Sequence, residues 1–453
     1  MNGRSVAKRC SVHCCPWGVL SFTAACRMGA GPRQAEDERA KVEEVLRQKA
    51  TIQFMSYIPP AFVQKAQDEW APQFSLKYPT IKVEVIIGPG GIIDMEQKLQ
   101  TMAAAGVPPD VYVNVRPASK FARLGLHTNL SPFIRRDRFD TRQFPEKVFE
   151  WFAKYQGDVY GLPVYMHAES ATLIYNRTLF QEAGVPEPPA QWGDPRWTWD
   201  AFVEAARRLT KTGPDGVLAQ AGVDTLAYPV HLPALWNAAW VTPDLKTATC
   251  DTPAMIECYT AYADLPNRLH VMPRPEERQQ MFGTTRPFFT QKVGMSTMGS
   301  WEFPTFQRLD TIDWAFMPWP KPVQAVSVQD PGMVYLPEGS KYKEQAWAFI
   351  KWMAEGQQFA TNFGWMPIVE AEGVKWAKEF FAARPNSRVT VLTDSLKYAV
   401  PTDPIFAVPG LESFVRQSIE PAITRIFRGE AGAKETLQGL KGPLQEALNQ
   451  AWR

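Results

Sequence analysis

Residues 160–176, "YGLPVYMHAESATLIYN", place three polar side chains with possible chemistry within four positions: His167, Glu169 and Ser170. A hydrolase would need such groups as base, orienting group and nucleophile around one point. Adjacent residues of an extended chain point to opposite faces, so Glu169 and Ser170 cannot address one point without a bend. His167 and Glu169 are two apart and share a face, and this spacing favours holding a polar ligand over catalysis.

Other motifs for catalysis or for metal binding are missing from the sequence. It has no G-x-S-x-G elbow, and its five His show no metal-ligand spacing. No paired acidic motif stands out, although carboxylates far apart in sequence can still flank one glycosidic bond. The "GPGG" at 88–91 matches neither phosphate-loop pattern, and Pro89 removes one N–H donor, so we interpret it as a turn. The residues themselves therefore indicate no metal site and no nucleophilic catalysis, and they leave a glycosidase open.

Length and charge limit the classes of protein that remain. The chain has 453 residues, 45% of them hydrophobic, which predicts two domains or two lobes with substantial cores. The 49 Lys and Arg nearly balance the 47 Asp and Glu without a basic block, so nucleic acid is not an expected partner. Sixteen Trp offer flat faces that suit amphipathic partners or the core.

The N-terminus predicts export. Basic residues at 4, 8 and 9 precede "CCPWGVLSFTAAC", which is too short to span a bilayer. The run Thr23-Ala24-Ala25 before Cys26 resembles the lipobox of bacterial lipoproteins, in which that Cys is acylated; a plain cleaved signal is the alternative. Acylation would tether the protein to the outer face of the cell membrane.

A charged spacer, residues 27–50, follows this leader and is expected to be helical or mobile. Beyond it, only Cys250 and Cys258 remain, and the sequence leaves open whether they form a disulfide.

The body of the chain alternates between strand and helix patterns. Strands are predicted at 51–57, 81–87 and 110–115, with amphipathic helices between them, which is a β-α-β-α-β opening. Later patterns predict a strand at 171–175, a helix opened by Thr198, another helix around 346–353 and Gly-punctuated helices over 411–450.

Six segments in a fixed order carry a resemblance to a known family. They are "FSLKYPTIKVEVI", "KLQTMAAAGVPPDVYV", "GDVYGLPV", "LIYNRTLFQEAGV" with "WTWDAFVEAARRLT", "GMSTMGSW" and "LPEGSKYKEQAWAFIKWM". Together they resemble the extracytoplasmic solute-binding proteins of ATP-binding-cassette (ABC) importers, in the carbohydrate-type, maltose-binding-protein-like group.

The resemblance implies an α/β fold of two lobes (type II), each a mainly parallel sheet flanked by helices, with a multi-strand hinge between them. Lobe 1 is expected over 51–165 and 330–372, and lobe 2 over 170–325 and 376–453. The implied function is to bind a sugar or oligosaccharide between the lobes and deliver it to the permease subunits, as a monomer. The resemblance implies no enzyme activity and no cofactor. A non-sugar solute (glycerol phosphate, polyamine or peptide) and a secreted glycoside-processing enzyme are the alternatives.

The resemblance also implies ligand contacts. Glu169 stands where the family presents an acid to bound sugar, and Trp301 of "GSW" stands where it stacks an indole on a sugar ring. The first lobe of maltose-binding protein also uses an acidic pair and a Trp that are not recognisable here, so maltose itself is not expected. The implied contacts are Glu169, Trp301, Tyr57, Asn114, Arg116, His167, Tyr228, His231 and Trp236.

Overall fold

The computed structural model describes residues 32–56, 64–88, 90–166, 172–214, 216–224, 229–283 and 285–452. Contacts divide the chain into two compact units, Met1–Glu43 and Glu44–Arg453. Helix α1 (Pro32–Arg47) begins in the first unit and ends in the second, so the charged spacer is helical over this range. Within the described ranges, no helix is long and apolar enough to cross a membrane. All further description concerns the larger unit.

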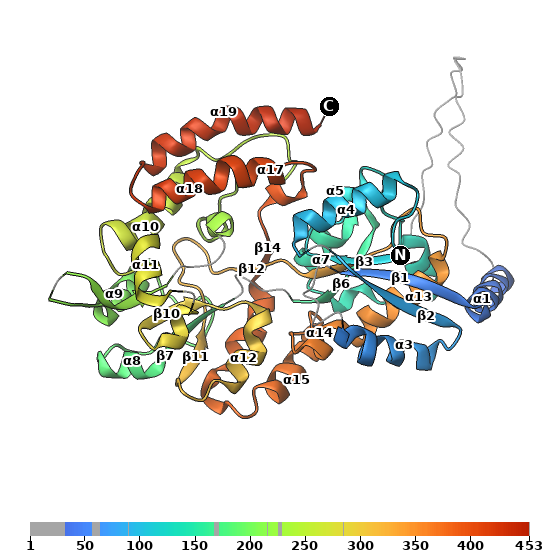
Figure 1. The fold of residues 1–453 in the computed structure, drawn as a ribbon, viewed down its shortest axis with the longest axis horizontal. Helices are drawn as coiled ribbons and strands as arrows, with labels where there is room; N and C mark the ends of the chain where they lie inside the picture. Colours follow the sequence, from blue (N-terminus) through green and yellow to red (C-terminus); the bar gives the residue numbers. More distant parts are fainter. Residues whose placement is uncertain are drawn as a thin grey trace, which may run out of the picture. The chain divides into compact units, whose positions relative to one another are not determined.

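The first sheet has five strands in the order β2-β1-β3-β13-β6 (Figure 1). They are β1 (Ala50–Ser56), β2 (Ile81–Ile87), β3 (Val111–Asn114), β6 (Gly161–Tyr165) and β13 (Gly332–Tyr335). β1 pairs in parallel with β2 and β3, whereas β13 is antiparallel to β3 and β6. The three strands predicted between residues 51 and 115 are confirmed, and the carboxyl ends of β1, β2 and β3 lie at one edge.

The helix after β1 changes its hydrogen-bond pattern part-way. A π-helical turn, η1 (Ala66–Trp70), leads into α3 (Ala71–Lys77), and both Trp70 and Phe74 are buried against the sheet. Pro72 has no N–H to donate to the preceding turn, which accounts for the break at this point. The helix type therefore changes next to Pro72.

Helix α4 (Ile92–Ala104) follows β2 and buries Met95 and Leu99, which lie four positions apart on one helical face. The turn before it begins at Gly88, whose N–H donates to the carbonyl of Ser56. A Cβ at Gly88 would lie 2.6 Å from that carbonyl oxygen, so only glycine allows the ends of β1 and β2 to approach this closely.

The second sheet has the order β11-β7-β10-β9-β8. Its strands are β7 (Leu173–Asn176), β8 (Lys211–Thr212), β9 (Leu218–Val223), β10 (Val293–Thr297) and β11 (Trp314–Met317). Only β9 and β10 pair in parallel; β7 lies antiparallel between β10 and β11, and β8 forms a hairpin with β9. This sheet is thus more mixed than the mainly parallel one expected. A short connection accounts for the β8–β9 hairpin, whereas β7 is antiparallel to strands far along the chain.

Two smaller pairs of strands complete the sheets. β12 (Ser327–Gln329) and β14 (Ala399–Pro401) pair in parallel and lie between the two large sheets (Figure 1). β4 (Lys154–Tyr155) and β5 (Asp158–Val159) form a hairpin.

Helices cover both sheets. Around the first sheet these are α5 (Ser119–Ala122), α6 (Ser131–Asp137), α7 (Glu146–Ala153), α13 (Lys343–Gly356) and α14 (Gln358–Phe363). Around the second are α8 (Arg177–Glu182), α9 (Trp199–Leu209), α10 (Pro253–Asn267), α11 (Pro275–Phe282), α12 (Phe303–Arg308), α15 (Glu370–Phe380) and α16 (Val389–Asp394).

The C-terminal helices are α17 (Glu412–Phe414), the π-turn η9 (Val415–Ile419), α18 (Glu420–Phe427) and α19 (Ala433–Ala451). Short 3-10 turns are η2 (Thr141–Gln143), η3 (Pro229–Trp236), η4 (Pro287–Thr290), η5 (Ser300–Glu302), η6 (Pro385–Ser387), η7 (Ser395–Tyr398) and η8 (Pro404–Ala407). The predicted cap of α9 is confirmed, since the Thr198 hydroxyl accepts the N–H of Ala201.

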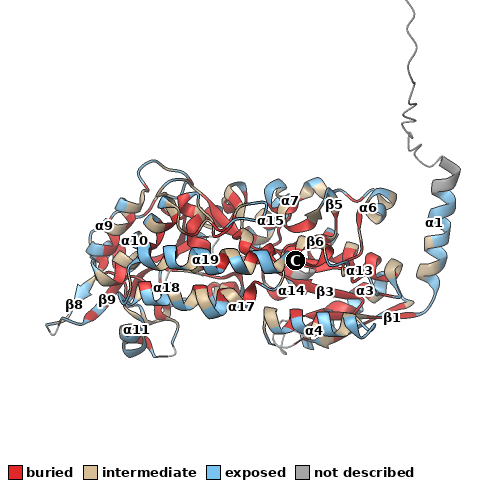
Figure 2. Ribbon diagram, turned by 90° about the horizontal axis from the view of Figure 1, so that it is seen from above, coloured by how far each residue is buried: buried red, intermediate tan, exposed pale blue. Residues whose placement is uncertain are grey.

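Buried apolar side chains form three cores. One surrounds the first sheet, a second surrounds the second sheet, and a third joins α10 to η8 and the C-terminal helices. Figure 2 shows that buried residues follow the strands and the inner faces of the helices. We call the part built on the first core lobe 1, and the part built on the other two lobe 2.

Candidate functional site

Several predicted site residues lie outside the described part of the chain. They are Tyr57, His167, Glu169, Tyr228 and the lipidation candidate Cys26. The described strands fix where three of these segments attach: β1 ends one residue before Tyr57, β7 begins after the segment with Glu169, and Asp224 at the end of β9 precedes the segment with Tyr228.

Trp301 is an exposed aromatic residue on a tight turn. The turn η5 follows β10, at the sheet edge where the parallel strands β9 and β10 both end. The side chain is 41% exposed, which is unusual for an indole in a protein that buries most of its large aromatics. Gly299 lies directly beneath the ring, and a methyl group added there would overlap the indole. The turn therefore presents one face of Trp301 outward while its backbone supports the other.

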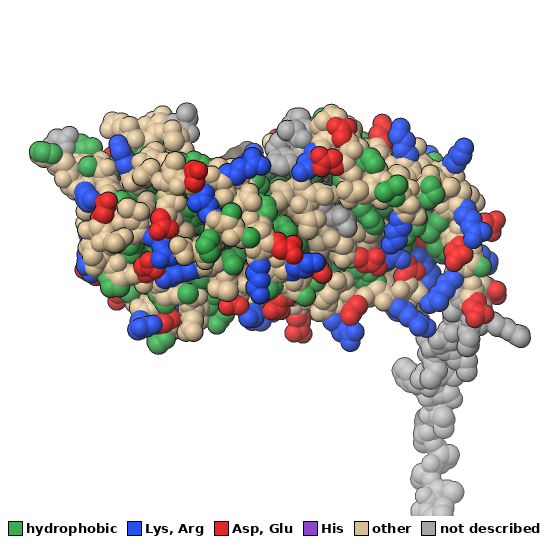
Figure 3. All heavy atoms as spheres, turned by 90° about the horizontal axis from the view of Figure 1, so that it is seen from below, with side chains coloured by type: hydrophobic (Ala, Val, Ile, Leu, Met, Phe, Trp, Pro, Cys, Tyr) green, Lys and Arg blue, Asp and Glu red, His purple; other side chains and the backbone are tan. Residues whose placement is uncertain are grey.

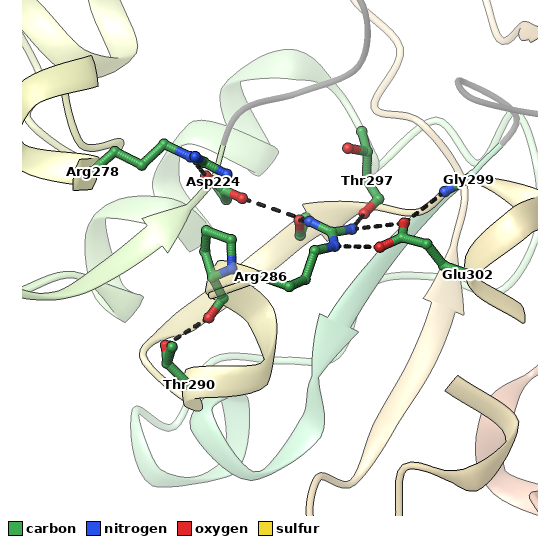
Figure 4. A network of polar contacts seen from close by, with 9 residues as sticks. Asp224, Arg278, Arg286, Thr290, Thr297, Gly299 and Glu302 are labelled. Atoms are coloured by element: carbon green, nitrogen blue, oxygen red, sulfur yellow. Dashed lines mark hydrogen bonds and ion pairs between the residues drawn. The ribbon is translucent and has the colours of Figure 1, made fainter. Parts of the chain in front are cut away.

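A network of charges holds this turn (Figure 4). The Arg286 guanidinium donates through Nε to Glu302 at 2.5 Å and to the carbonyl of Thr297, while Glu302 accepts the N–H of Gly299 at 3.0 Å. Asp224, 1% exposed, lies 3.8 Å from Arg286. Both residues that flank the Trp301 turn, Gly299 and Glu302, are thus tied to the ends of β9 and β10.

Arg278 completes the network. Its Nε donates to Asp224 at 3.1 Å, so this buried carboxylate has two cations beside it. A buried carboxylate is stable only with such partners. The sequence gave no sign of this set, because its members come from four different segments.

A cavity of about 590 Å³ lies between the two lobes, within the size range of small-molecule sites. Lobe 1 supplies the start of α4 and Arg116, and lobe 2 supplies η3, η8 and the C-terminal helices. The lining residues are Ile92, Ile93, Arg116, His231, Asp330, Phe406, Glu412, Val415, Arg416 and Glu420. Of the predicted residues, the cavity brings together Arg116 and His231; Trp301 is not among its lining residues.

Arg116 and His231 approach the same aromatic ring. The Arg116 guanidinium carbon lies 4.6 Å from the centre of the Phe406 ring, and the His231 ring meets it edge-on at 5.7 Å. The carbonyl of Arg116 accepts the hydroxyl hydrogen bond of Tyr335. Within the described residues, the buried Nε of Arg116 has no hydrogen-bond partner. Phe406 was not predicted, since nothing in its local sequence sets it apart from a core residue.

Asn114 lies in the interior of lobe 1, where it pairs within the lobe, and the ligand contact predicted for it stays a prediction. The side chain is fully buried; its amide donates to Glu96 at 2.9 Å and its oxygen accepts the N–H of Val115. Glu96 also accepts from Lys120 at 2.6 Å, and Lys120 reaches Glu412 of lobe 2. Burial lowers the pKa of Lys120 to about 8, opposed by the charge of Glu96.

Trp236 is also buried, at 3% exposure, and packs edge-on against Trp199 with ring centres 5.1 Å apart. The structure gives it a core position, and its predicted ligand contact stays a prediction. The pattern of polar and apolar residues in "AYPVHLPALW" does not distinguish a core residue from a ligand contact, because η3 buries nearly all of its side chains.

The family follows from a match over two thirds of the chain: residues 56–358 match the model of the bacterial extracellular solute-binding proteins. The chain belongs to this family. The family binds and carries solutes and is not a family of enzymes, which agrees with the prediction of no catalysis.

Relatives of this solute-binding protein are distant. It is 27% identical over 151 residues to an uncharacterized ABC transporter extracellular-binding protein of Pyrococcus horikoshii, which covers 33% of this chain and 32% of the relative. It is 20% identical over 298 residues to a maltotriose-binding protein of Pyrococcus abyssi, covering 61% and 58%. The aligned parts thus span less than two thirds of these relatives.

Solved structures show the same fold over nearly the whole chain. An ABC substrate-binding protein of Listeria monocytogenes in complex with cycloalternan matches with a TM-score of 0.71 at 22% identity, covering 89% of this chain and 99% of that one. The sugar-binding protein MalE of Xanthomonas citri matches with 0.71 at 19%, covering 88% and 98%. The two-lobed, type II fold predicted for this solute-binding protein is confirmed.

In the described part of the solute-binding protein, Cys250 and Cys258 are buried free thiols. Cys258 packs in the core of the second sheet and Cys250 in the core of the C-terminal helices, so they do not meet. Burial raises the pKa of Cys250 to about 11 and that of Cys258 well above its usual value. Within the described ranges, no three His, Cys, Asp or Glu side chains gather as a metal site.

Proposed function

We propose that this solute-binding protein binds an oligosaccharide between its lobes and delivers it, unaltered, to the permease subunits of an ABC importer. The observation that carries the proposal is the inter-lobe cavity, in which an aromatic ring and charged groups from both lobes converge. A sugar has apolar C–H patches on its ring faces and hydroxyls at its edges, and this combination of groups suits both.

The Trp301 turn supports the same proposal. An exposed indole fixed by an ion network is ready to stack on a sugar ring without ordering cost at binding. With Arg116 and His231, it makes up the described part of the proposed site; Glu169, Tyr57, His167 and Tyr228 are proposed from sequence. Relatives support a sugar: one is a maltotriose-binding protein, and one structure contains cycloalternan.

Closure couples binding to transport. A solute that contacts both lobes stabilises the closed state by the extra binding free energy that this state offers. We propose lobe boundaries of 51–165 with 330–372 and 170–325 with 376–453; the separate cores of the two sheets support them. The permease would recognise the closed arrangement.

A calorimetric panel tests the function. Maltotriose, mannotriose, cycloalternan and glycerophosphocholine are titrated into the wild type, Trp301→Ala and Glu169→Ala. We expect an oligosaccharide to bind and each variant to lose about tenfold or more in affinity, since one stacked ring or charged hydrogen bond contributes about 1.4 kcal/mol or more.

The matched control is Leu76→Ala, which truncates an apolar side chain that is 87% exposed on α3, and it should bind like the wild type. Wild-type binding of glycerophosphocholine alone would overturn the sugar assignment. Equal affinity of the two site variants and wild type would overturn the site.

We further propose export as a monomeric protein anchored through acylated Cys26, supported by the lipobox-like sequence before it. On the surface shown in Figure 3, acidic and basic side chains are interspersed, which suits a protein free in an aqueous compartment. Cys26→Ala should release the protein from the membrane fraction of expressing cells; retention in that fraction would contradict the anchor.

A further inference from the structure

Three cations of one short segment in lobe 1 contact the C-terminal part of lobe 2. The Arg116 guanidinium stacks on Phe406 at 4.6 Å, Lys120 pairs with Glu412, and the Arg123 guanidinium stacks on Trp452 at 4.4 Å. Each contact joins residues nearly 300 or more positions apart in sequence, so all three are tertiary contacts between the lobes.

One short segment carries all three cations. Arg116 lies just before helix α5, Lys120 lies within it, and Arg123 follows its last residue. Helix α5 packs on η8 of lobe 2. Three cations of this segment thus meet aromatic and acidic partners from lobe 2.

The outer contact is held in place from both sides. Arg123 donates through Nε to the carbonyl of Ser119 at 2.9 Å, and Tyr155 lies 5.3 Å from its guanidinium carbon on the side of lobe 1. Trp452 donates through its indole N–H to the carbonyl of Leu245 at 2.8 Å. Both partners are therefore oriented before they meet, and little side-chain freedom is lost in the contact.

The three contacts differ in their distance from the cavity. Arg116, Phe406 and Glu412 belong to its lining, whereas Arg123 and Trp452 do not. The outer contact can therefore be removed without changing any group that lines the cavity.

We propose that Arg116, Lys120 and Arg123 form an inter-lobe clamp, and that Arg123 and Trp452 are positioning residues that set solute affinity by stabilising the arrangement of the lobes around the cavity. The affinity part rests on the proposed function; the clamp itself does not. A protein whose competent state is only partly populated binds more weakly by that fraction. Loss of a cation–π contact should therefore weaken binding about three- to tenfold.

The first experiment needs no solute. Spin labels on Leu76→Cys in lobe 1 and Glu204→Cys in lobe 2, both exposed positions, report the inter-lobe distance by pulsed electron paramagnetic resonance. In the labelled background, Trp452→Ala and Arg123→Gln should broaden or lengthen the distance distribution. Trp452→Phe, which keeps an aromatic face, should restore much of the wild-type distribution. Arg142→Gln, which removes an exposed cation of lobe 1 that pairs only locally with Asp140, is the matched control.

Unchanged distances in both clamp variants, with a lower melting temperature alone, would overturn the clamp and leave the contact as static packing. The second experiment titrates maltotriose into the same unlabelled variants and expects three- to tenfold weaker binding through a faster off-rate. Wild-type affinity in the clamp variants would overturn the positioning role. If the wild type itself fails to bind maltotriose, that result counts against this sugar as solute, while the distance measurement still decides on the clamp.

Discussion

The two lobes use their buried charges in different ways. In lobe 1, Glu96 and Lys120 lie beside the cavity, nearly without solvent exposure, and the second partner of Lys120 is Glu412 of the other lobe. In lobe 2, Arg286 and Glu302 stay within one lobe and hold the turn of an exposed indole. The comparison teaches that lobe 1 directs its buried charge to the lobe boundary, whereas lobe 2 uses its own to present an aromatic surface.

Removal of the lobe 1 cation should have the largest effect. Lys120→Met leaves two carboxylates buried without their cation, and breaking such a buried pair lowers the free energy of unfolding by about 3–5 kcal/mol. Urea denaturation measures this loss. Lys147→Met, at an exposed position on α7, is the control and should change stability by less than about 0.5 kcal/mol. Equal stability of the two variants would show that the buried charges of lobe 1 are not coupled.

The corresponding change in lobe 2 should lower the free energy of unfolding by less, but it should also weaken the affinity for the oligosaccharide. Arg286→Met removes the partner of Glu302, but these side chains are 22% and 18% exposed, so water screens part of the loss. We expect about 2 kcal/mol by the same denaturation, together with weaker oligosaccharide binding because the Trp301 turn is no longer held. A loss of stability with unchanged affinity would show that the ion network does not contribute to oligosaccharide binding.

A smaller change tests the indole without touching the charges. In Gly299→Ala, the added methyl group must displace the Trp301 ring, so we expect about tenfold weaker oligosaccharide binding, or about 1.4 kcal/mol. The comparison is Gly439→Ala within α19, where a Cβ meets nothing within 4 Å and should add up to about 1 kcal/mol of stability. Calorimetric titration of both variants decides, and wild-type affinity in Gly299→Ala would mean that the ring orientation is irrelevant.

These differences also mark what the sequence could predict. The strands and helices of both lobes follow local patterns, such as the apolar spacing of α4 and the Thr198 cap, and local patterns are visible in one chain. Arg116 was predicted as a contact and lines the cavity, but its companions Phe406 and Glu412 come from the other end of the chain. Their side chains are ordinary in type, so only tertiary packing reveals them.

Burial is likewise set by tertiary packing. Asn114 and Trp236 have side chains that suit a sugar site, and the structure buries both, Asn114 against Glu96 and Trp236 against Trp199. Residue type alone does not separate a ligand contact from a buried position. Family resemblance places a segment more reliably than it places one side chain.

The smallest expected net effect in the wild type is a pH dependence, because two groups contribute slopes of opposite sign that offset each other. In lobe 1, burial lowers the pKa of His127 to about 3. Below about pH 6.5, the unfolded chain therefore binds a proton on this residue that the folded chain does not bind, and the free energy of unfolding falls as the pH falls. In lobe 2, burial raises the pKa of Asp403 to about 7, against the hydrogen bonds that it accepts from two backbone N–H groups. Between about pH 4 and 7 the folded chain keeps a proton that the unfolded one loses, so this group makes stability fall as the pH rises.

Single variants should separate the two opposing slopes, each at most about 1.4 kcal/mol per pH unit. Asp403→Asn should leave a free energy of unfolding that rises from pH 4 to 6.5, and His127→Asn should leave one that falls over the same window. The double variant should have a nearly flat profile. Because the comparison uses the pH slope of the free energy of unfolding, a pH-independent loss of stability from either substitution does not affect it. Urea denaturation at half-unit pH steps measures these profiles. His127 contacts the rings of Tyr112 and Tyr335 in lobe 1, whereas Asp403 accepts backbone N–H groups of Trp240 and Ile405 in lobe 2. If the two single variants gave slopes of the same sign, other groups would control the pH response and the lobes would not differ in it.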